Sequence, residues 1–406
     1  MSAADEGLLA KVQGLSDLEL AFLVSLMSRE HCIITAHPSA LDDLLEELQL
    51  IASKTFGLNT VIVDCQPTTT LDDFVSALLL PNHPPPSRTP SPFLPRSDPY
   101  FHSHSHSHSH SHSHSHTRGA GASGLAPLSP INPPLSPASY TPGETHPAAA
   151  ATTNPFSIAK VVLARNLDRA PKAVQIQALE LLRTRRVFTR TAVHSAPKTF
   201  LFVPVLATGR GRNGSRTTIG LTPQLNDLFF ISHYHDLEDG FAHLDDEFDV
   251  GDGTETASTE SVVVVKRGAG VDPKIDPLLS EADISRLSEL SQNVKIDIDV
   301  LRYQMNIISF LRMHRALSRG ASPTATKHFD RLVRCLAPLH KVDYVTPALV
   351  ALAARKIYLH RVEVVEPAHE RSVQWGSKIE AVEALLEGVG PEDVIEDVLG
   401  MVAPPL

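Results

Sequence analysis

The sequence predicts an α/β fold in which a mostly parallel sheet lies between two layers of helices and is followed by an all-α bundle. Three observations lead to this prediction. Up to residue 235, short apolar runs alternate with amphipathic helical patterns, as in parallel sheets built from strand–helix–strand units. From residue 281 onward, the dominant periodicity is helical. The 406 residues are also enough for two domains and their linkers.

The first part of the predicted core, residues 1–80, alternates between helical and β-rich patterns. The expected elements are a helix over 7–29, a strand over 31–35, a helix over 41–55, a strand over 59–65 and a helix over 70–80. Within the helix over 41–55, Leu44, Leu45 and Leu48 share one face, as a helix packed on a sheet requires.

The second part of the core, residues 156–235, continues this alternation. The apolar run KVVLA at 160–164 predicts a buried strand, and a helix opens at Pro171. Residues 199–207 predict another strand. We expect Pro204 to make that strand irregular, because proline lacks the N–H group that a β-ladder needs.

Two stretches interrupt these patterns. Residues 81–155 consist largely of Pro, Ser, Ala and His, with strict His-Ser alternation over 102–116. Few large apolar side chains are present to offset the entropy cost of ordering, so we predict a disordered insertion. Its histidines could chelate Zn²⁺ or Ni²⁺, although a solvated linker is the simpler interpretation. Residues 236–280 are acidic and contain glycine, which predicts a flexible linker with one strand at 261–266.

Residues 281–362 predict a helical bundle. Ser322 and Thr346 each precede a proline, which is the pattern of a hydroxyl N-cap followed by proline at the first helical position. Each cap is followed by a one-sided apolar stripe, and the stripes are Phe329, Leu332, Val333 and Leu336, then Leu349, Val350, Ala353 and Ile357. Upstream, a third helix that we expect to be capped by Asp299 places Leu301, Gln304, Ile308 and Leu311 on one face.

The remaining residues, 363–406, form a tail with short helices expected near 377–386 and 391–399. The composition limits which partners and which cellular compartment we expect for the chain. Its net charge of −10 disfavours broad binding to nucleic acid or anionic membranes, and no apolar run approaches the roughly 20 residues of a membrane span. The only cysteines are Cys32, Cys65 and Cys335, each in an apolar run. This sparse, odd number predicts a reducing intracellular compartment, with the cytoplasm as the expected location.

Three strings of residues resemble the magnesium-chelatase I subunit and MoxR family of AAA+ ATPases. Residues 320–362 read GASPTATKHFDRLVRCLAPLHKVDYVTPALVALAARKIYLHRV and are similar to that family's helical lid. Residues 167–187, LDRAPKAVQIQALELLRTRRV, resemble the helix that follows the Walker B strand, and residues 221–230, LTPQLNDLFF, resemble "LrPQLLDRFgl". The resemblance implies an AAA+ core in two halves, 1–80 and 156–235, and a lid over 281–362.

The same alignment shows replacements at five nucleotide-handling elements. The P-loop position reads AHPSALDD and lacks glycine, although a phosphate cradle needs small residues, a lysine and a hydroxyl. Asp42 stands in place of the P-loop lysine and Asp43 in place of the P-loop hydroxyl. Arg165 and Asn166 replace the two Walker B carboxylates, and Arg210 replaces the sensor-1 asparagine. Leu228 replaces the ring arginine, and Thr324 replaces the lid arginine. Two carboxylates facing a triphosphate would each disfavour binding by roughly a few kcal/mol.

These replacements predict a degenerate site with no catalytic residues and no bound cofactor; ATP and Mg²⁺ are expected only if the family activity survives. The predicted role is that of a scaffold or partner subunit in complex assembly. The resemblance further implies a protein partner, of which a von Willebrand factor A-domain protein is one kind, and a ring-type oligomer. Two alternatives stay open: an ATP-dependent magnesium chelatase or MoxR-type chaperone ATPase, and a nucleic-acid-associated adaptor.

Three other patterns have weaker functional interpretations. Residues 209–214 match GxGxxG, but no helical pattern follows directly, so a mobile loop is favoured over a dinucleotide site. His233 and His235 with Asp236 form half of a metal site, but no cluster supplies further ligands, so no metal is expected. The arginines at 183, 185, 186 and 190 could contact nucleic acid, although a helix C-terminus explains the first three.

Overall fold

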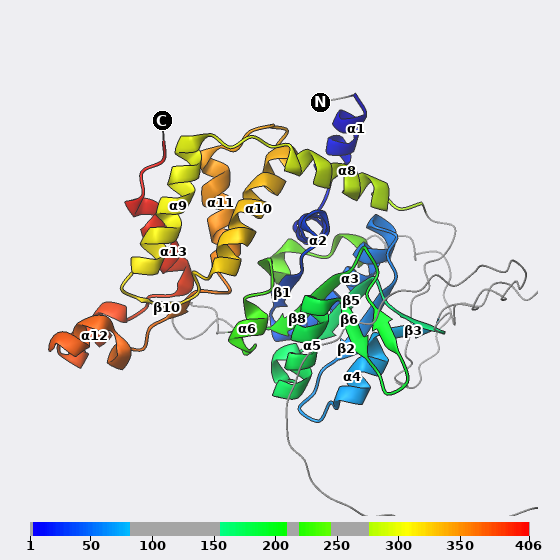
Figure 1. Ribbon diagram of the computed structural model, residues 1–406, viewed down its shortest axis with the longest axis horizontal. Helices are drawn as coiled ribbons and strands as arrows, with labels where there is room; N and C mark the ends of the chain where they lie inside the picture. Colours follow the sequence, from blue (N-terminus) through cyan, green and yellow to red (C-terminus); the bar gives the residue numbers. More distant parts are fainter. Residues whose placement is uncertain (1–2, 82–154, 209–218, 245–275, 406) are drawn as a thin grey trace, which may run out of the picture. The chain divides into compact units, whose positions relative to one another are not determined.

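The computed structural model describes residues 3–81, 155–208, 219–244 and 276–405. The core is a five-stranded, all-parallel sheet, which confirms the predicted fold class (Figure 1). Its strands, in spatial order, are β2 (Thr60–Asp64), β5 (Val161–Arg165), β8 (Leu201–Ala207), β1 (Cys32–Ala36) and β9 (Ile231–His235). The strand that carries Arg165 is therefore separated from β1 by β8 alone.

Helices cover both faces of this sheet, because alternate residues of its buried strands point to opposite sides. Ile34 lies in one apolar cluster with α2 (Asp17–Ser28) and α3 (Leu41–Leu50). Its neighbour Ile33 lies in a second cluster with α4 (Leu71–Leu78) and α5 (Lys172–Thr184). The three-layer αβα arrangement thus follows from the apolar runs that predicted the strands.

The irregularity predicted for β8 is wrong, because the strand continues unbroken through Pro204. Pro204 pairs in register with Ala164 on the β5 side. On the other side, the pairing with β1 begins only one residue later, at Ile34 opposite Val205. The ladder with β1 therefore starts only after Pro204, which has no N–H to donate, while β8 itself continues.

The helix predicted over 7–29 is two helices, α1 (Ala3–Val12) and α2. The break occurs because Ser16 starts α2 with a capping box: its hydroxyl accepts from the amide of Glu19, and the Glu19 carboxylate accepts from the amide of Ser16. The helix predicted over 41–55 comprises α3 and a π-helical turn, Ile51–Thr55.

The arginine-rich end of α5 also differs from the prediction. The helix stops at Thr184, where Arg185 adopts a left-handed conformation with φ of 57°. Arg186 does not belong to the helix but starts a hairpin, in which β6 (Arg186–Phe188) pairs with β7 (Val193–Ser195). The dipole of α5 consequently explains the position of only one of these arginines, Arg183.

The predicted insertion at 81–155 lies almost wholly outside the described residues, as does the strand expected at 261–266. The two ends of the predicted insertion, residues 81 and 155, are among the described residues. β3 (Leu79–Pro81) and β4 (Phe156–Ile158) form an antiparallel pair that places Pro81 opposite Phe156. The chain therefore leaves and re-enters the core at neighbouring positions, so a short connection could span the same two points.

We expect that replacing residues 82–154 with a short Gly/Ser linker preserves a cooperative unfolding transition, because the β3–β4 pair already brings the two ends together. Thermal unfolding monitored by circular dichroism tests this expectation. Loss of the cooperative transition would contradict it and would show that the replaced residues belong to the core.

The C-terminal half is a helical bundle, as predicted. Its helices are α8 (Glu281–Gln292), α9 (Ile298–Met313), α10 (Pro323–Leu339), α11 (Pro347–Tyr358), α12 (Ile379–Leu386) and α13 (Pro391–Met401). A short β10–β11 pair (Leu317–Arg319 with Glu363–Val364) lies beside them. The cap of α9 is Asp297, two residues before the expected Asp299, and its carboxylate accepts from the Asp299 amide.

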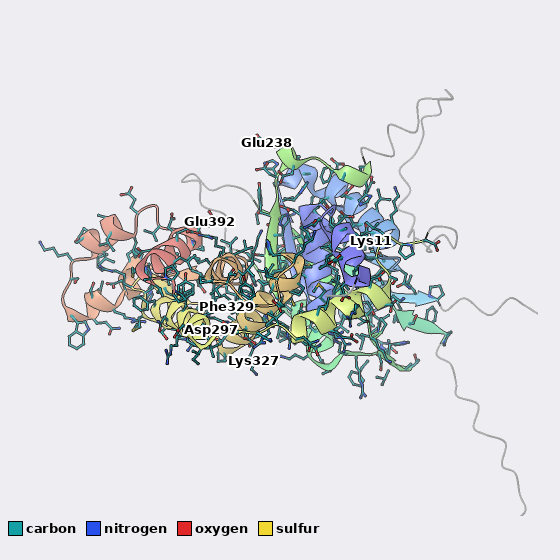
Figure 2. All side chains as sticks on the ribbon, turned by 90° about the horizontal axis from the view of Figure 1, so that it is seen from above. Lys11, Glu238, Asp297, Lys327, Phe329 and Glu392 are labelled. Atoms are coloured by element: carbon teal, nitrogen blue, oxygen red, sulfur yellow. The ribbon has the colours of Figure 1, made fainter. Side chains whose placement is uncertain are left out.

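The two predicted apolar stripes lie inside this bundle. Phe329 and Val333 are fully buried, whereas Lys327 on the same helix is exposed (Figure 2). In the predicted tail, α13 packs against α9 and α11 and buries Val394 and Val398. None of the described helices is long and apolar enough to cross a membrane.

Candidate functional site

The candidate site lies where β1 ends and α3 begins. A one-turn 3₁₀ helix (Pro38–Ala40) connects them, in place of an open glycine-rich loop. His37 closes the turn, since its Nδ1 accepts from the Ser39 amide and lies 2.8 Å from Ser39 Oγ. In this turn the amides of Ser39 and Ala40 are already bonded, to His37 Nδ1 and to the His37 carbonyl.

Asp42 and Asp43 occupy the first turn of α3, where carboxylates are stabilised by the helix dipole. Arg165 is the last residue of β5, two strands away, and it reaches across to this turn. Its Nη2 lies 2.7 Å from Asp42 Oδ1, with side-chain exposures of 31% and 73%. Asp42, which the resemblance aligns with the P-loop lysine, is thus ion-paired with Arg165, which it aligns with a Walker B carboxylate.

A second carboxylate lies on the other side of Arg165. Asp64 ends the neighbouring strand β2, directly opposite Arg165 in the register, and its Oδ1 is 4.0 Å from Arg165 Nε. That nitrogen is buried and has no hydrogen-bond partner among the described residues. The next residue, Asn166, turns the chain away with φ of 53°, a left-handed conformation that asparagine tolerates.

These residues do not fit Mg-ATP. An arginine side chain stays protonated and cannot ligate Mg²⁺, so Arg165 would repel the metal where the family places a carboxylate. Asp42 would repel the phosphates where the family places a lysine. The two replaced charges instead neutralise each other within the chain. No reaction step through ATP or Mg²⁺ can be derived from this geometry.

The remaining predicted positions do not join this pair. Leu228 is partly buried against the α4–α5 side of the sheet, as an apolar residue would be. Thr324 lies in the first turn of α10, and Arg210 is outside the described residues. Of the predicted pocket positions, Asp42 and Arg165 thus form an ion pair, which the sequence analysis had not predicted.

A buried arginine that the sequence did not single out joins the core to the helical bundle. Arg361 follows α11 and its side chain is 1% exposed. Its Nε is 3.3 Å from Asp227 Oδ1, in the loop between α6 (Pro223–Asn226) and β9. The guanidinium also donates to the backbone carbonyls of Asp227, Phe229, Phe230 and Ile357.

The neighbours of Arg361 strengthen this junction. Burial lowers the pKa of His328 to about 3, so its ring is neutral and Nδ1 can accept from Arg361 Nη2 at 2.7 Å. Burial also lowers the pKa of Arg361 to about 10, which leaves it charged at neutral pH. Ser322, the N-cap of α10, donates to Asp227 Oδ1 at 2.6 Å. Two of the three strings that carry the family resemblance thus meet here.

A second polar cluster anchors the start of the predicted acidic linker. The amides of His243 and Leu244 donate to the buried carboxylate of Glu47 at 3.0–3.2 Å. His243 Nε2 lies 3.0 Å from Glu19 Oε1. Burial alone would raise the pKa of Glu19, but hydrogen bonds from His243, Thr55 and the Ser16 amide lower it to about 2.

The weaker candidates find structural explanations. His233 and His235 are buried side chains of β9, and no group of three metal-binding residues occurs within the described ranges. Arg185 donates to the carbonyl of Arg29, and Arg190 pairs with Asp72 at 3.0 Å. The three cysteines are buried free thiols. The GxGxxG string at 209–214 lies outside the described residues.

Comparisons with known proteins agree with this architecture, although no family model matches the chain. Chaperone MoxR1 of Mycobacterium tuberculosis is 24% identical over 257 residues, which are 61% of this chain and 58% of that protein. The uncharacterized protein YeaC of Bacillus subtilis is 24% identical over 132 residues, 32% of this chain and 36% of that protein. Maintenance of telomere capping protein 2 of Lachancea thermotolerans is 27% identical over 115 residues, 27% of this chain and 40% of that protein.

These matches span 36% to 58% of the curated relatives' own lengths. A solved structure, described as a candidate ATPase from Cytophaga hutchinsonii, aligns with a TM-score of 0.56 at 14% identity. It covers 99% of this chain and 97% of its own, and at that identity it shows the fold alone. Together the matches confirm the resemblance to MoxR-type AAA+ ATPases.

Proposed function

We propose that this chain is a MoxR-like AAA+ module that has lost ATP hydrolysis and acts as a scaffold or partner subunit in complex assembly. The ion pair between Arg165 and Asp42 carries the proposal. Hydrolysis in this kind of site needs a lysine and a metal held by a carboxylate around the phosphates. Here both positions have the opposite charge, and each charge is satisfied by the other.

Nucleotide binding tests the proposal directly. We expect millimolar Mg-ATP to leave the melting temperature of the full-length protein unchanged. A ligand present at 100 times its Kd would stabilise the fold by about 2.7 kcal/mol. For a chain of this size, that should raise the melting temperature by several degrees. A saturable rise of this size would contradict the proposal.

A double variant separates the effect of charge from that of the other replaced positions. Asp42→Lys with Arg165→Asp keeps an ion pair but restores the signs found in the family. A response to Mg-ATP in this variant alone would assign the loss to the swapped charges. An active MoxR-type ATPase measured in parallel shows that the assay detects binding.

Partners follow from the same proposal. We infer an intracellular, non-catalytic subunit that binds another protein, with von Willebrand factor A-domain proteins as the first class to examine, and that can enter a ring-type oligomer. The name of one relative, a chaperone, supports a role in assembly. Affinity purification of the tagged full-length chain, with an unrelated tagged protein as control, tests this; recovery of no specific protein would contradict it.

A nucleic-acid-associated adaptor is the second candidate. The name of the Lachancea thermotolerans relative refers to telomere capping, and Arg186 is an exposed basic side chain at the β6–β7 hairpin. Binding through phosphates would weaken steeply with added salt. A fluorescence-anisotropy titration with duplex DNA at two salt concentrations separates this candidate from the scaffold. The enzyme alternative, a magnesium chelatase or chaperone ATPase, is decided by the Mg-ATP measurement.

A further inference from the structure

Residues 181–226 concentrate positive charge in a chain whose net charge is −10. This stretch holds eight lysines and arginines and no aspartate or glutamate. Such segregation of charge within one chain is typical of a surface that binds a polyanion. The basic residues of this stretch that the structure describes lie at the end of α5, in the β6–β7 hairpin and just after it, and they are Arg183, Arg185, Arg186, Arg190 and Lys198 (Figure 1).

The β6–β7 hairpin has one buried face and one exposed face. Val187 and His194, which lie opposite each other in the register, are both buried. Alternate residues of a strand point to opposite faces, so Arg186, Phe188 and Val193 share the other face. Phe188 is 55% exposed, and Val193, its partner across the hairpin, is 46% exposed. The outer face therefore presents an exposed aromatic ring two residues from an arginine.

A second exposed ring lies next to the hairpin. Phe156 of β4 is 46% exposed, and its carbonyl oxygen is 3.2 Å from Nδ1 of His194 on β7. The surface around the hairpin therefore contains two exposed phenylalanines from different strands. Neighbouring exposed apolar side chains mark an interaction site more reliably than a single exposed residue does.

The arginines around these rings keep part of their charge. Arg186 is exposed and forms no ion pair within the described parts of the chain. Arg183 is exposed too, although Glu180 lies three residues before it on α5 and offsets part of its charge. Arg190, in the turn of the hairpin, pairs with Asp72, but the two side chains are 87% and 75% exposed, so water and salt weaken that pair. The hairpin thus combines aromatic rings with positive charge that a ligand can use.

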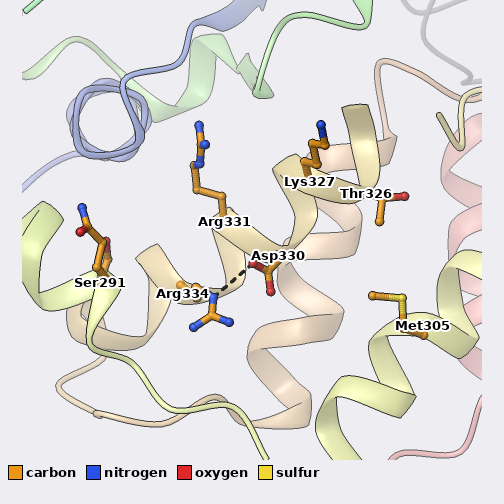
Figure 3. Close-up of a pocket in the computed structure, with 8 residues that line it drawn as sticks. Ser291, Met305, Thr326, Lys327, Asp330, Arg331 and Arg334 are labelled. Carbon is orange, nitrogen blue, oxygen red and sulfur yellow. Dashed lines mark hydrogen bonds and ion pairs between the residues drawn. The ribbon is translucent and has the colours of Figure 1, made fainter. Parts of the chain in front are cut away.

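The groove between α8, α9 and α10 is another basic surface, and its charges are compensated differently (Figure 3). It has a volume of about 450 Å³ and is lined by Lys327, Arg331 and Arg334. Asp330 lines it as well and pairs with Arg334 at 3.2 Å, while Arg331 pairs with Glu30. Its lining residues include no aromatic side chain. The hairpin is therefore the better match for a ligand that carries both negative charge and flat rings.

We propose that the outer face of the β6–β7 hairpin, together with Phe156, binds single-stranded nucleic acid. Unpaired bases stack on exposed aromatic rings, and arginines contact the phosphates. Arg186 and Phe188 are two residues apart on one strand face, roughly 7 Å, so one nucleotide can contact both. In a duplex the base faces are already stacked on each other, so the rings favour single strands. The inference rests on the second candidate function, a nucleic-acid-associated adaptor, and adds the site and the form of nucleic acid.

Fluorescence anisotropy with the full-length chain tests the proposal. The probes are labelled oligo(dT) and oligo(U) of about 20 nucleotides, which exceeds the span of a typical single site, and a duplex of the same length. We expect at least one single strand to bind about tenfold more tightly than the duplex at the same salt concentration, with affinity falling as salt rises. The two single strands show whether DNA or RNA is preferred.

The outcomes separate this inference from the function on which it rests. Equal or tighter binding to the duplex would overturn the single-strand proposal and leave a nucleic-acid-associated adaptor standing. Absence of saturable binding to all three probes would overturn both.

Variants at Phe188 test the role of the ring. Phe188→Ala should weaken binding to the single strand by about tenfold, because stacking on one base is lost. Phe188→Tyr keeps an aromatic ring and should retain most of the affinity. The side chain is exposed, so the fold should tolerate both changes. Unchanged binding by Phe188→Ala would show attraction by charge alone and would overturn the proposal.

Variants at two exposed basic residues test the position of the site. Arg186→Ala should weaken binding and lower the slope of log K against log salt by about 0.7, the value for one lost phosphate contact on a single strand. Lys327→Ala removes the same charge from the groove on the bundle and is the matched control, so affinity and slope should stay unchanged. Equal effects of the two substitutions would show that binding follows overall charge and would overturn the assignment to the hairpin.

Discussion

Replacing Arg361 with alanine is expected to lower the free energy of unfolding by about 3–5 kcal/mol, because it removes a buried guanidinium together with its ion pair to Asp227 and its hydrogen bonds to buried backbone carbonyls. The substitution would also leave the carbonyls of Phe229 and Phe230 without this donor. Since these groups belong to the core and Arg361 follows the bundle helix α11, the loss should loosen the connection between them. Urea-induced unfolding followed by circular dichroism measures the change.

Two comparison variants make the Arg361 result specific. Arg361→Lys keeps the charge but cannot reproduce the fork of donors, so it should also destabilise, by less than alanine. Arg302→Ala removes an arginine that is 70% exposed and whose ion pair, among the described residues, is with Asp299 on its own helix, so it should cost at most about 0.5 kcal/mol. Similar losses for Arg302→Ala and Arg361→Ala would show that the buried junction is not the cause.

The second large effect is expected from Leu332→Ala, which should destabilise the bundle by about 2–5 kcal/mol. Leu332 is 2% exposed and packs with Phe329 and Val333 in the interior of the bundle. Removing its branched end would leave a cavity that these neighbours can only partly fill. The same unfolding measurement reports the loss.

Lys327→Ala is the matched control on the same helix. Its side chain is exposed and lies off the apolar stripe, so the substitution should cost no more than about 0.5 kcal/mol. Comparable losses from Leu332→Ala and Lys327→Ala would mean that the buried face of α10 has been assigned incorrectly.

Most of the core could be predicted because its strands and helices leave local signals. The strands β1, β5 and β8 are apolar runs that are buried on both faces, and the bundle helices α10 and α11 show one-sided stripes after hydroxyl caps. The elements that were missed depend on weaker or non-local features. One capping box splits the first helix at Ser16, and the β6–β7 hairpin lies in a stretch without clear alternation.

The candidate site, too, could be predicted only in part from the sequence. The sequence identified Asp42 and Arg165 as replaced residues, because the resemblance aligned each to a motif. It did not show that the two side chains form an ion pair, since they lie more than a hundred residues apart and belong to different strand–helix units. The available signal for the ion pair was that Asp42 and Arg165 carry opposite charges at two positions that the family brings together.

The amino-acid sequence was enough to predict the fold class and the resemblance to the magnesium-chelatase/MoxR family, because each rests on local periodicity or on a contiguous string. The assignment of the replaced pocket residues stays a prediction from that resemblance. The ion pair between Asp42 and Arg165 and the burial of Arg361 between core and bundle are visible only in the folded structure. The structure also shows that Trp375 stays exposed, whereas Val382 and Leu386, close by in the sequence, are buried. These features depend on the distance between side chains that are remote in the chain, and no local pattern encodes such a distance.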